Sequence, residues 1–366
     1  MNNPRNEPFV RNAWYIAAWP EELAAKDDDG DGTETGVVGR TIMNEPIVLF
    51  RDANGRASAL EDSCCHRGAP LSHGWTDGKG LKCGYHGLVF DGDGKCIDIP
   101  GQDTVPASAR VRSYPVVERH QCIWIWMGDA DAADESKILD CPFHDQPEKW
   151  PHKKAVFTIN ANYMMMIDNL MDLSHLAYVH RKTIGGLPEA HAAAEMAIRP
   201  TDTGVFYERW MMNAPAPPTY VKAVGFKGNI DRWHKFEYVA PATVIQNNGA
   251  IDVGRGAREN QDQPGLHFQL IHHATPETET SFHYFFSVAN GYRQDEPAAT
   301  KQLFDESLPT FKEDKAIMEV QQARLDRDPG RTLVSIKADK ALYLARKHLH
   351  GMIEAERAGA SAAAAE

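Results

Sequence analysis

The chain has 366 residues, 42% of them hydrophobic and 25% charged, a composition typical of globular proteins and a length sufficient for two domains of about 150 residues. Its 39 Lys and Arg residues against 51 Asp and Glu residues give a formal net charge of -12, which repels phosphate backbones and anionic lipid surfaces. These values exclude a single small binding module and argue against nucleic acid as a partner.

The distribution of cysteines indicates where metal chemistry is to be expected. All six lie between Cys64 and Cys141. The sequence contains no run of about 18 to 20 apolar residues and starts without the features of a signal peptide, so we expect a cytoplasmic protein without a membrane partner. In a reducing compartment, clustered cysteines favour a metal site over a disulfide framework.

The first part of the chain is expected to be all-β, with its core at about residues 40–128. Residues 41–52 and 56–62 are predicted to be strands around a turn, and residues 87–99 are predicted to form a hairpin around Asp93-Gly94. Residues 119–128 contain Ile-Trp-Ile-Trp, which is typical of a strand buried on both faces.

A stretch rich in Asp, Ala and Pro at residues 129–150 is predicted to contain the domain junction. The first domain is placed at residues 1–145 and the second at residues 146–366. In the second domain, the predicted strands are residues 154–162, 204–212, 265–275 and 278–290, and the predicted helical regions are residues 163–180 and 299–357. An antiparallel sheet with helices packed on it makes the fold class α+β.

A first candidate metal site lies in the all-β part. Cys64-x-His66 is followed, after sixteen intervening residues, by Cys83-x-x-His86. Four such ligands could hold zinc tetrahedrally, or they could hold a 2Fe-2S cluster with two thiolates on one iron and two imidazoles on the other. Zinc fingers usually pair Cys with Cys and His with His, whereas each loop here carries one of each. The spacing therefore favours the cluster and leaves zinc as the alternative.

A second candidate site lies in the predicted helix at residues 163–180. Asn169, Asp172 and His175 recur every three residues, so on a helix they would form one polar stripe. His180 lies about 140° farther around an ideal helix than His175, so both rings can bind one metal only if the helix bends or ends between them. Two imidazoles and a carboxylate on one face of Fe(II) leave open positions for O2 and substrate. If the first site holds a 2Fe-2S cluster, that cluster donates electrons, and a mononuclear iron at the second site would be their acceptor.

Together the two sites resemble those of the oxygenase components of Rieske non-heme iron oxygenases, with the vanillate and dicamba O-demethylase branch as the nearest likeness. The resemblance covers nearly the whole chain and includes the segments FVRNAWYIAAWPEEL, CCHRGAPLSHG, CGYHGLVFDGDGKC, IDNLMDLSHLAYVH and FKEDKAIMEVQQ. It implies an N-terminal all-β Rieske 2Fe-2S domain, followed by a helix-grip catalytic domain with a seven-stranded antiparallel sheet. Because electrons pass between subunits in this family, it also implies a head-to-tail homotrimer.

The resemblance assigns metal ligands to matching positions. The implied ligands are Cys64 and Cys83 for one iron of the cluster, His66 and His86 for the other, and His175, His180 and Asp314 for the mononuclear iron. Glu313, which precedes Asp314, is the alternative third ligand.

Three further residues receive roles from the same resemblance. Asp172 is implied as a bridging carboxylate that accepts from His175 of its own subunit and from His86 of the partner subunit. Asn169 is implied to lie near the iron, and it can equally be a packing or capping amide. His272 is implied as a contact for a substrate carboxylate. It has an adjacent histidine, and on a strand one of the two must face away from the pocket.

The implied activity is that of a monooxygenase acting on a small aromatic substrate with O2 and with NADH-derived electrons that arrive through a separate reductase or ferredoxin. We expect O-demethylation of a methoxybenzoate-like compound in aromatic hydrocarbon catabolism, with release of formaldehyde. N-dealkylation or hydroxylation of another aromatic or alicyclic substrate is the alternative, because the sequence between Trp233 and Gly265 departs from that branch. A Rieske electron carrier is a further alternative, against which the three mononuclear iron ligands argue.

Overall fold

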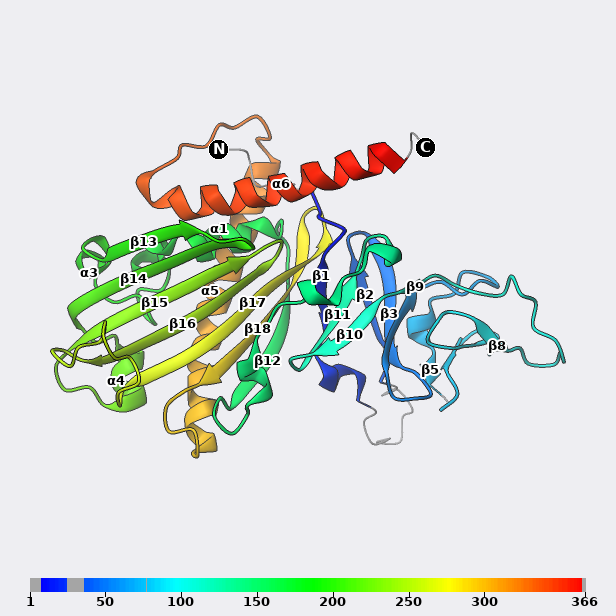
Figure 1. Ribbon diagram of the computed structural model, residues 1–366, viewed down its shortest axis with the longest axis horizontal. Helices are drawn as coiled ribbons and strands as arrows, with labels where there is room; N and C mark the ends of the chain where they lie inside the picture. The colour runs from blue at the N-terminus through cyan, green and yellow to red at the C-terminus, as the bar shows by residue number, and fades with distance from the viewer. Residues whose placement is uncertain (1–7, 25–35, 77, 364–366) are drawn as a thin grey trace. The chain divides into compact units, whose positions relative to one another are not determined.

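The computed structural model describes residues 8–24, 36–76 and 78–363 (Figure 1). The chain forms two compact units, one of residues 11–140 and one of residues 141–363 together with residues 8–10. None of the described helices is both long enough and apolar enough to cross a membrane. The division after Asp140 falls inside the stretch rich in Asp, Ala and Pro.

The described part of the first unit folds into small antiparallel sheets and 3-10 helices. In sheet order, the strands are β1 (Trp14–Ala18), β11 (Cys122–Trp126) and β10 (Val116–Arg119); β2 (Val38–Ile42), β3 (Glu45–Arg51), β4 (Ala57–Glu61) and β9 (Ser113–Tyr114); and β5 (Trp75–Thr76), β6 (Leu81–Lys82), β7 (Val89–Phe90) and β8 (Cys96–Asp98). The 3-10 helices are η2 (Pro20–Leu23), η3 (Leu71–His73), η4 (Ala130–Ala132) and η5 (Glu135–Lys137).

Three of the four predictions for this unit are confirmed, including the strand at residues 56–62, which is β4, and one is corrected. Strand β11 is central in its sheet and buried at every position, as the Ile-Trp-Ile-Trp run predicts. The hairpin of β7 and β8 turns at Gly94, whose φ of +79° is open to glycine at little cost. The single strand predicted at residues 41–52 is wrong, because Met43 and Asn44 both have positive φ and turn the chain between β2 and β3.

The second unit is built on one antiparallel sheet of seven strands. In sheet order these are β12 (His152–Ile159), β18 (Ser281–Asn290), β17 (Leu266–Thr278), β16 (Thr243–Asp252), β15 (Asn229–Val239), β14 (Gly204–Pro215) and β13 (Glu195–Pro200). The helices are η6 (Pro142–Asp145), α1 (Met164–Met171), η7 (Leu173–His175), α2 (Leu176–Val179), α3 (Pro188–Ala192), α4 (Pro218–Val224), α5 (Pro297–Asp326), η8 (Lys337–Asp339) and α6 (Lys340–Ala363). The fold is therefore α+β, with the seven-stranded antiparallel sheet that the resemblance implies.

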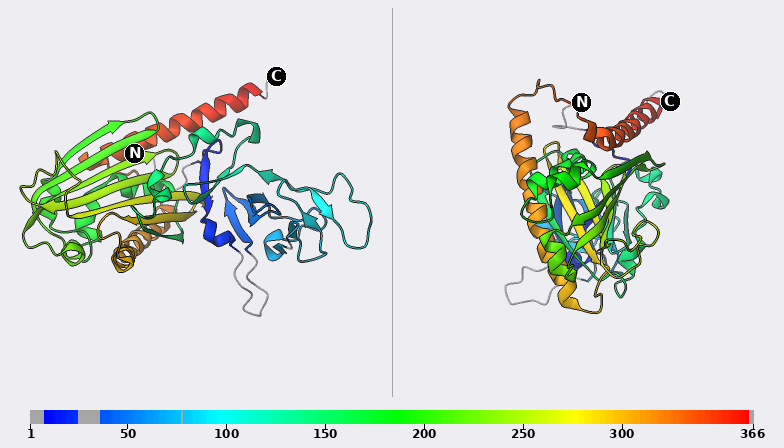
Figure 2. Two further views of the ribbon diagram at one scale, coloured as in Figure 1. Left: turned by 60° about the horizontal axis from the view of Figure 1, so that its bottom comes forward. Right: turned by 90° about the vertical axis from the view of Figure 1, so that its left-hand side faces the viewer.

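The helices cover the sheet unevenly. Helix α5 packs on β12 and β18, and α1 contacts both α5 and the strands β15, β16 and β17, so these helices share one face of the sheet (Figure 2). Helix α6 packs on β13, β14 and α1. The helical region predicted at residues 299–357 is therefore two helices with different partners.

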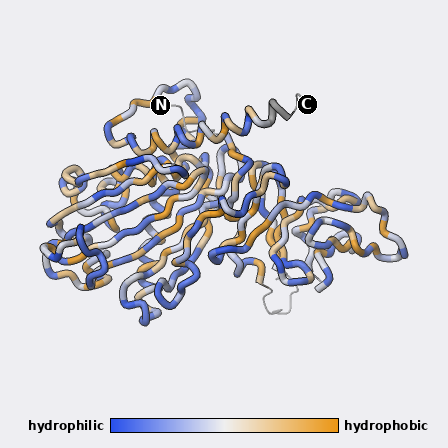
Figure 3. The backbone as a smooth tube through the Cα atoms, in the orientation of Figure 1, coloured by the Kyte–Doolittle hydropathy of each residue, from blue (hydrophilic) through white to orange (hydrophobic). Residues whose placement is uncertain are grey.

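The alternation of side chains along each strand determines which residues face the helices. Figure 3 shows hydrophobic and hydrophilic residues interspersed along β13 to β16, as expected where successive side chains point to opposite faces. Strand β18 is buried at all ten positions. The face of β15 to β17 that lies under α1 supplies the floor of the cavity described below.

Candidate metal centres

The two Cys-His loops of the first unit have the same backbone construction. The main-chain N–H of Cys64 donates to Ala69 and its carbonyl accepts from Gly68, at 2.9 and 2.8 Å. Cys83 makes the same two bonds, with Leu88 at 2.8 Å and Gly87 at 3.0 Å. Both loops therefore turn at a glycine four residues after the cysteine, and both glycines have positive φ.

The side chains of these loops have the donor set that a Rieske cluster needs. Cys64 and Cys83 are 3% and 2% exposed, and their thiols interact. Burial, with the Cys83 thiol beside it, raises the pKa of Cys64 to about 11. His66 and His86 are exposed, and their ring centroids lie 4.5 Å apart. Two buried thiols and two facing imidazoles fit a cluster with unlike ligands on its two irons.

The Gly84→Ala variant tests how tightly the second loop is packed. A Cβ at Gly84 would lie 2.6 Å from the main-chain oxygen of His73, so we expect overpacking of about 1–3 kcal/mol and a marked loss of bound cluster. Visible circular dichroism and acid-labile sulfide measure the loss. The control is Gly55→Ala, where φ is +77° but no atom lies within 4 Å. Equal cluster contents in the two variants would contradict the expectation.

The second site is formed where the predicted helix at residues 163–180 is interrupted. Helix α1 ends at Met171, and Asp172 adopts an extended conformation with φ of -127°. Its carboxylate accepts from the main-chain N–H of Ser174 at 2.9 Å, as an N-cap residue does. The helix prediction, and with it the continuous polar stripe, is therefore wrong at Asp172. The break precedes His175, and the next helix, α2, ends at Val179, so a helix does end between His175 and His180 as the sequence requires.

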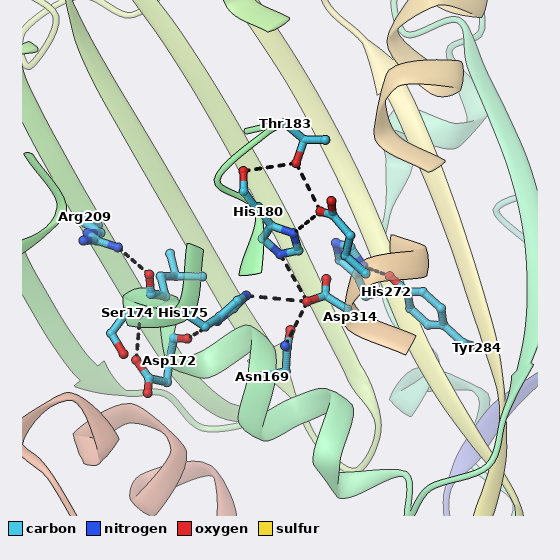
Figure 4. A network of polar contacts seen from close by, with 12 residues as sticks. Asn169, Asp172, Ser174, His175, His180, Thr183, Arg209, His272, Tyr284 and Asp314 are labelled. Carbon is cyan, nitrogen blue, oxygen red and sulfur yellow. Dashed lines mark hydrogen bonds and ion pairs between the residues drawn. The ribbon is translucent and has the colours of Figure 1, made fainter. Parts of the chain in front are cut away.

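The three predicted mononuclear iron ligands come together at this interruption (Figure 4). One ligand atom each from His175, His180 and Asp314 lies within 4.8 Å of the others. Asp314 Oδ1 is 3.1 Å from His180 Nε2 and 3.7 Å from His175 Nε2. Asp314 is on α5 and only 6% exposed. Nε2 of His180 is buried beside the Asp314 carboxylate, so that both atoms can ligate one metal.

Each imidazole is oriented through its other nitrogen. His175 Nδ1 lies 2.6 Å from the main-chain oxygen of Asp172, and His180 Nδ1 lies 2.8 Å from Glu313 Oε2. Thr183 also donates to Glu313 Oε2, at 3.2 Å. An acceptor at Nδ1 fixes the tautomer in which the Nε2 lone pair faces the metal. Glu313 thus contacts the far side of His180, and Asp314 is the carboxylate among the clustered ligand atoms.

The pKa shifts at this site follow from burial and from nearby carboxylates. Burial lowers the pKa of His175, with Asp314 opposing it, which favours the neutral imidazole that a metal needs. Burial acts in the same direction on His180, but Asp314 and Glu313 outweigh it, and the pKa of His180 is raised. A bound cation takes the place of that proton.

Asn169 and Asp172 occupy positions beside the ligands. Asn169 Nδ2 donates to Asp314 Oδ1 at 3.0 Å, and its own Oδ1 is buried without a partner. Within this chain, His175 bonds the main-chain oxygen of Asp172, whereas the Asp172 carboxylate accepts from Ser174. That contact differs from the carboxylate contact implied by the resemblance, and the link to the partner subunit remains a prediction.

A cavity opens beside the three ligands, between α1, α2, α4 and α5 and the sheet. Its floor consists of even-numbered residues that pair across β15, β16 and β17. From one end to the other, the floor rows are Arg232 and Leu266; His234, Asn248 and Phe268; Phe236, Gln246 and Leu270; and His272. Leu170, Leu173, Leu176 and Phe311 face the floor. The cavity is thus largely apolar, with a few polar groups that could orient a ligand.

His272 is the histidine of its pair that lines this cavity. Its Nδ1 bonds the hydroxyl of Tyr284, and its Nε2 is buried without a partner. Burial lowers its pKa to about 3, so the ring is neutral. His273 faces the other side of the sheet and bonds Thr243 Oγ1 at 2.7 Å. Arg232 also lines the cavity, and it could not be identified from the sequence, because a single sequence does not distinguish a buried arginine from the common exposed one.

Comparisons with known proteins cover nearly the whole chain. Residues 159–355 match the vanillate O-demethylase oxygenase C-terminal domain, and residues 13–115 match the Rieske [2Fe-2S] domain. The chain is 38% identical to the iron-sulfur subunit of the toluene-4-sulfonate monooxygenase system of Comamonas testosteroni, over 96% of this chain and 99% of that protein. It is 35% identical to the vanillate O-demethylase oxygenase subunit of a Pseudomonas strain, over 97% and 98%. The crystal structure of dicamba monooxygenase bound to 3,6-dichlorosalicylic acid has a TM-score of 0.86 at 32% identity, covering 96% of this chain and 100% of that one.

Proposed function

This chain belongs to the vanillate O-demethylase-like family of Rieske oxygenases, and from that premise we propose that it removes the methyl group of a methoxybenzoate-like substrate. It is a terminal oxygenase that incorporates O2 and acts on aromatic substrates. It carries a Rieske 2Fe-2S cluster and a mononuclear non-heme iron at His175, His180 and Asp314. Demethylation, as the reaction carried out on the aromatic substrate, is our proposal.

The proposed reaction balances for an aryl methyl ether. When bound, the cluster supplies single electrons and the mononuclear iron activates O2 for insertion of one oxygen atom into a C–H bond. Oxygen inserted at the methyl group gives a hemiacetal, whose bond between the methyl carbon and the aryl oxygen breaks to yield formaldehyde and a phenol. The second oxygen atom leaves as water after uptake of two electrons and two protons.

The residues of this chain supply positioning and the exclusion of water. Glu313 and the main-chain oxygen of Asp172 hold the two imidazoles in the tautomer that ligates through Nε2. Asn169 donates to Asp314 Oδ1 and orients that carboxylate. The leucines and Phe311 around the cavity exclude bulk water from the reacting methyl group. The observation that carries the proposal is the position of the three ligands in the wall of a largely apolar cavity.

The partners of the reaction belong to the same proposal. An iron-sulfur subunit needs a donor, so we propose that a separate NADH-dependent reductase, directly or through a ferredoxin, reduces the cluster. The name of the relative from Comamonas testosteroni describes a multicomponent system, which supports this arrangement. We also propose a head-to-tail homotrimer in which Asp172 of one subunit bonds His86 of the partner subunit.

A single-turnover experiment tests the proposed reaction. The iron-loaded protein is reduced without oxygen, mixed with methoxybenzoates or with their methyl analogues, and exposed to labelled O2. We expect about one formaldehyde per active site from a methoxybenzoate, because one oxygen atom is inserted for each O2 consumed. Label in a benzylic or ring alcohol, with no formaldehyde, would replace demethylation with hydroxylation. The toluene-4-sulfonate relative favours the methyl group of a toluene derivative as the second candidate.

A further inference from the structure

Arg232 is a buried arginine that lines the cavity of the mononuclear iron site. It lies on β15, at one end of the cavity floor, and is 3% exposed. Its guanidinium lies 4.5 Å from the ring centroid of Tyr220, itself 3% exposed. Both terminal nitrogens donate to the main-chain oxygen of Ile184 at a long 3.4 Å. The Nε atom is buried and has no hydrogen-bond partner.

The positive charge of this arginine is not balanced by the protein. Among the described residues, no carboxylate forms an ion pair with Arg232. Glu306 also lines the cavity, but it pairs with Lys222 at 2.5 Å and accepts from Gln302. A buried charge is costly unless it is paired. An unpaired guanidinium beside a cavity is therefore a site that an anion completes.

The position of Arg232 connects this charge to the reaction site. Ile184, which accepts from Arg232, belongs to the turn that follows the ligand His180. The N–H groups of Thr183 and Gly185, on either side of Ile184, bond the His180 carbonyl at 2.9 and 3.0 Å. The guanidinium is thus held against the turn that begins at the iron ligand His180.

We propose that Arg232 binds the anionic group of an aromatic carboxylate or sulfonate substrate, with the aromatic ring lying over the part of the floor between Arg232 and the iron. This inference rests on the proposed aromatic substrate and adds the residue that selects for its charge. A guanidinium has five donors in a planar arrangement that matches two oxygens of a carboxylate or sulfonate.

His272 is the competing position for the same anion. Its row lies six residues from the Arg232 row along β17, a separation of about 20 Å at 3.3–3.4 Å per residue. The two groups therefore face opposite ends of the floor. His272 is neutral and already bonded to Tyr284, whereas Arg232 carries a fixed charge. A charged donor binds an anion more strongly than a neutral one, so Arg232 is the stronger site.

Anaerobic binding measurements test this assignment without turnover. Iron-loaded protein is titrated calorimetrically with benzoate and 4-toluenesulfonate, and with the neutral benzamide and 4-toluenesulfonamide. We expect Arg232→Gln to weaken binding of at least one acid by about 100-fold and to change binding of the amides by less than about threefold. Arg232→Lys keeps the charge but not the planar edge and should recover about tenfold. The control is Arg258→Gln, an exposed arginine paired with Glu195, which should bind all four compounds like the parent.

The outcomes separate this inference from the proposed function. Parent protein that binds acids and amides equally, or acid binding unchanged in Arg232→Gln, would overturn the anion site and leave aromatic oxidation standing. Loss of acid binding in His272→Asn but not in Arg232→Gln would move the anion to the other end of the floor and overturn the inference. Parent protein that binds none of the four compounds would overturn the anion site, whereas the proposed demethylation is decided by formaldehyde release in the single-turnover experiment. If Arg232→Gln weakens the binding of only one of the two acids, the result supports the anion site and shows whether it selects a carboxylate or a sulfonate.

Discussion

The Asp314→Ala variant is expected to hold about two iron atoms per chain instead of about three, and to lose turnover by more than about 100-fold. Asp314 supplies the carboxylate of the three clustered ligand atoms, and it is 6% exposed on α5. Without it, two imidazoles remain, and the buried site offers no negative charge to the metal. The cluster lies in the other unit of the chain, so its spectrum should be unchanged. Iron and acid-labile sulfide analysis, with visible circular dichroism, measures both metals.

The neighbouring Glu313→Ala variant is the matched control for this prediction. Glu313 contacts Nδ1 of His180 rather than the clustered ligand atoms. Its loss should weaken iron binding by about 10–100-fold, the range found for partners that orient a ligand, while saturating iron restores about three atoms per chain. If Glu313→Ala lost the third iron permanently and Asp314→Ala kept it, Glu313 would be the ligand.

The Asp172→Asn variant is expected to keep both metals and to turn over about 100-fold more slowly. The contact with His175 uses the main-chain oxygen, which the substitution leaves in place, and an asparagine side chain can still accept from the Ser174 N–H. What the variant loses is the negative charge available to His86 of the partner subunit in the proposed homotrimer. The effect should therefore appear in electron transfer rather than in metal content.

Stopped-flow absorbance checks this prediction through the rate at which a reduced cluster is oxidised in a single turnover with substrate and O2. Asp172→Ala serves as the control, because it also removes the cap on the helical turn and should lower iron content as well as rate. A parent rate in Asp172→Asn would remove the bridge from the mechanism. Loss of iron in Asp172→Asn would give the residue a structural role instead.

The two metal-binding segments could be predicted because their chemistry is local in the chain. Each Cys-His loop places two ligands within four residues, and His175 and His180 share one short segment. Asp314 is different, since it lies on another helix far along the chain and no spacing relates it to the histidines. Only the family resemblance assigned it, and the structure brings its carboxylate within reach of both rings.

Strand β16 shows why part of the sheet could not be predicted. Its centre reads Asn247-Asn248-Gly249, and Asn-Gly is typical of a hairpin turn. In the structure, Gly249 lies opposite Trp233 on β15, and a Cβ there would meet the Trp233 ring at 2.1 Å. The glycine leaves room for the indole, so tertiary packing and not turn chemistry decides its place. The same holds for β15, whose buried Arg232 breaks the apolar pattern expected of an inner strand.

The iron ligands and the cavity floor come from different elements of the fold, so the range of substrates can evolve separately from the iron site. The iron ligands come from α5 and from the short turn after α1, whereas the floor comes from β15, β16 and β17. Phe236, Gln246 and Leu270 form one floor row, and none of them supplies a ligand atom. Mutations in that row can therefore accumulate without loss of iron, so that selection can act on new substrates while the reaction centre is inherited unchanged.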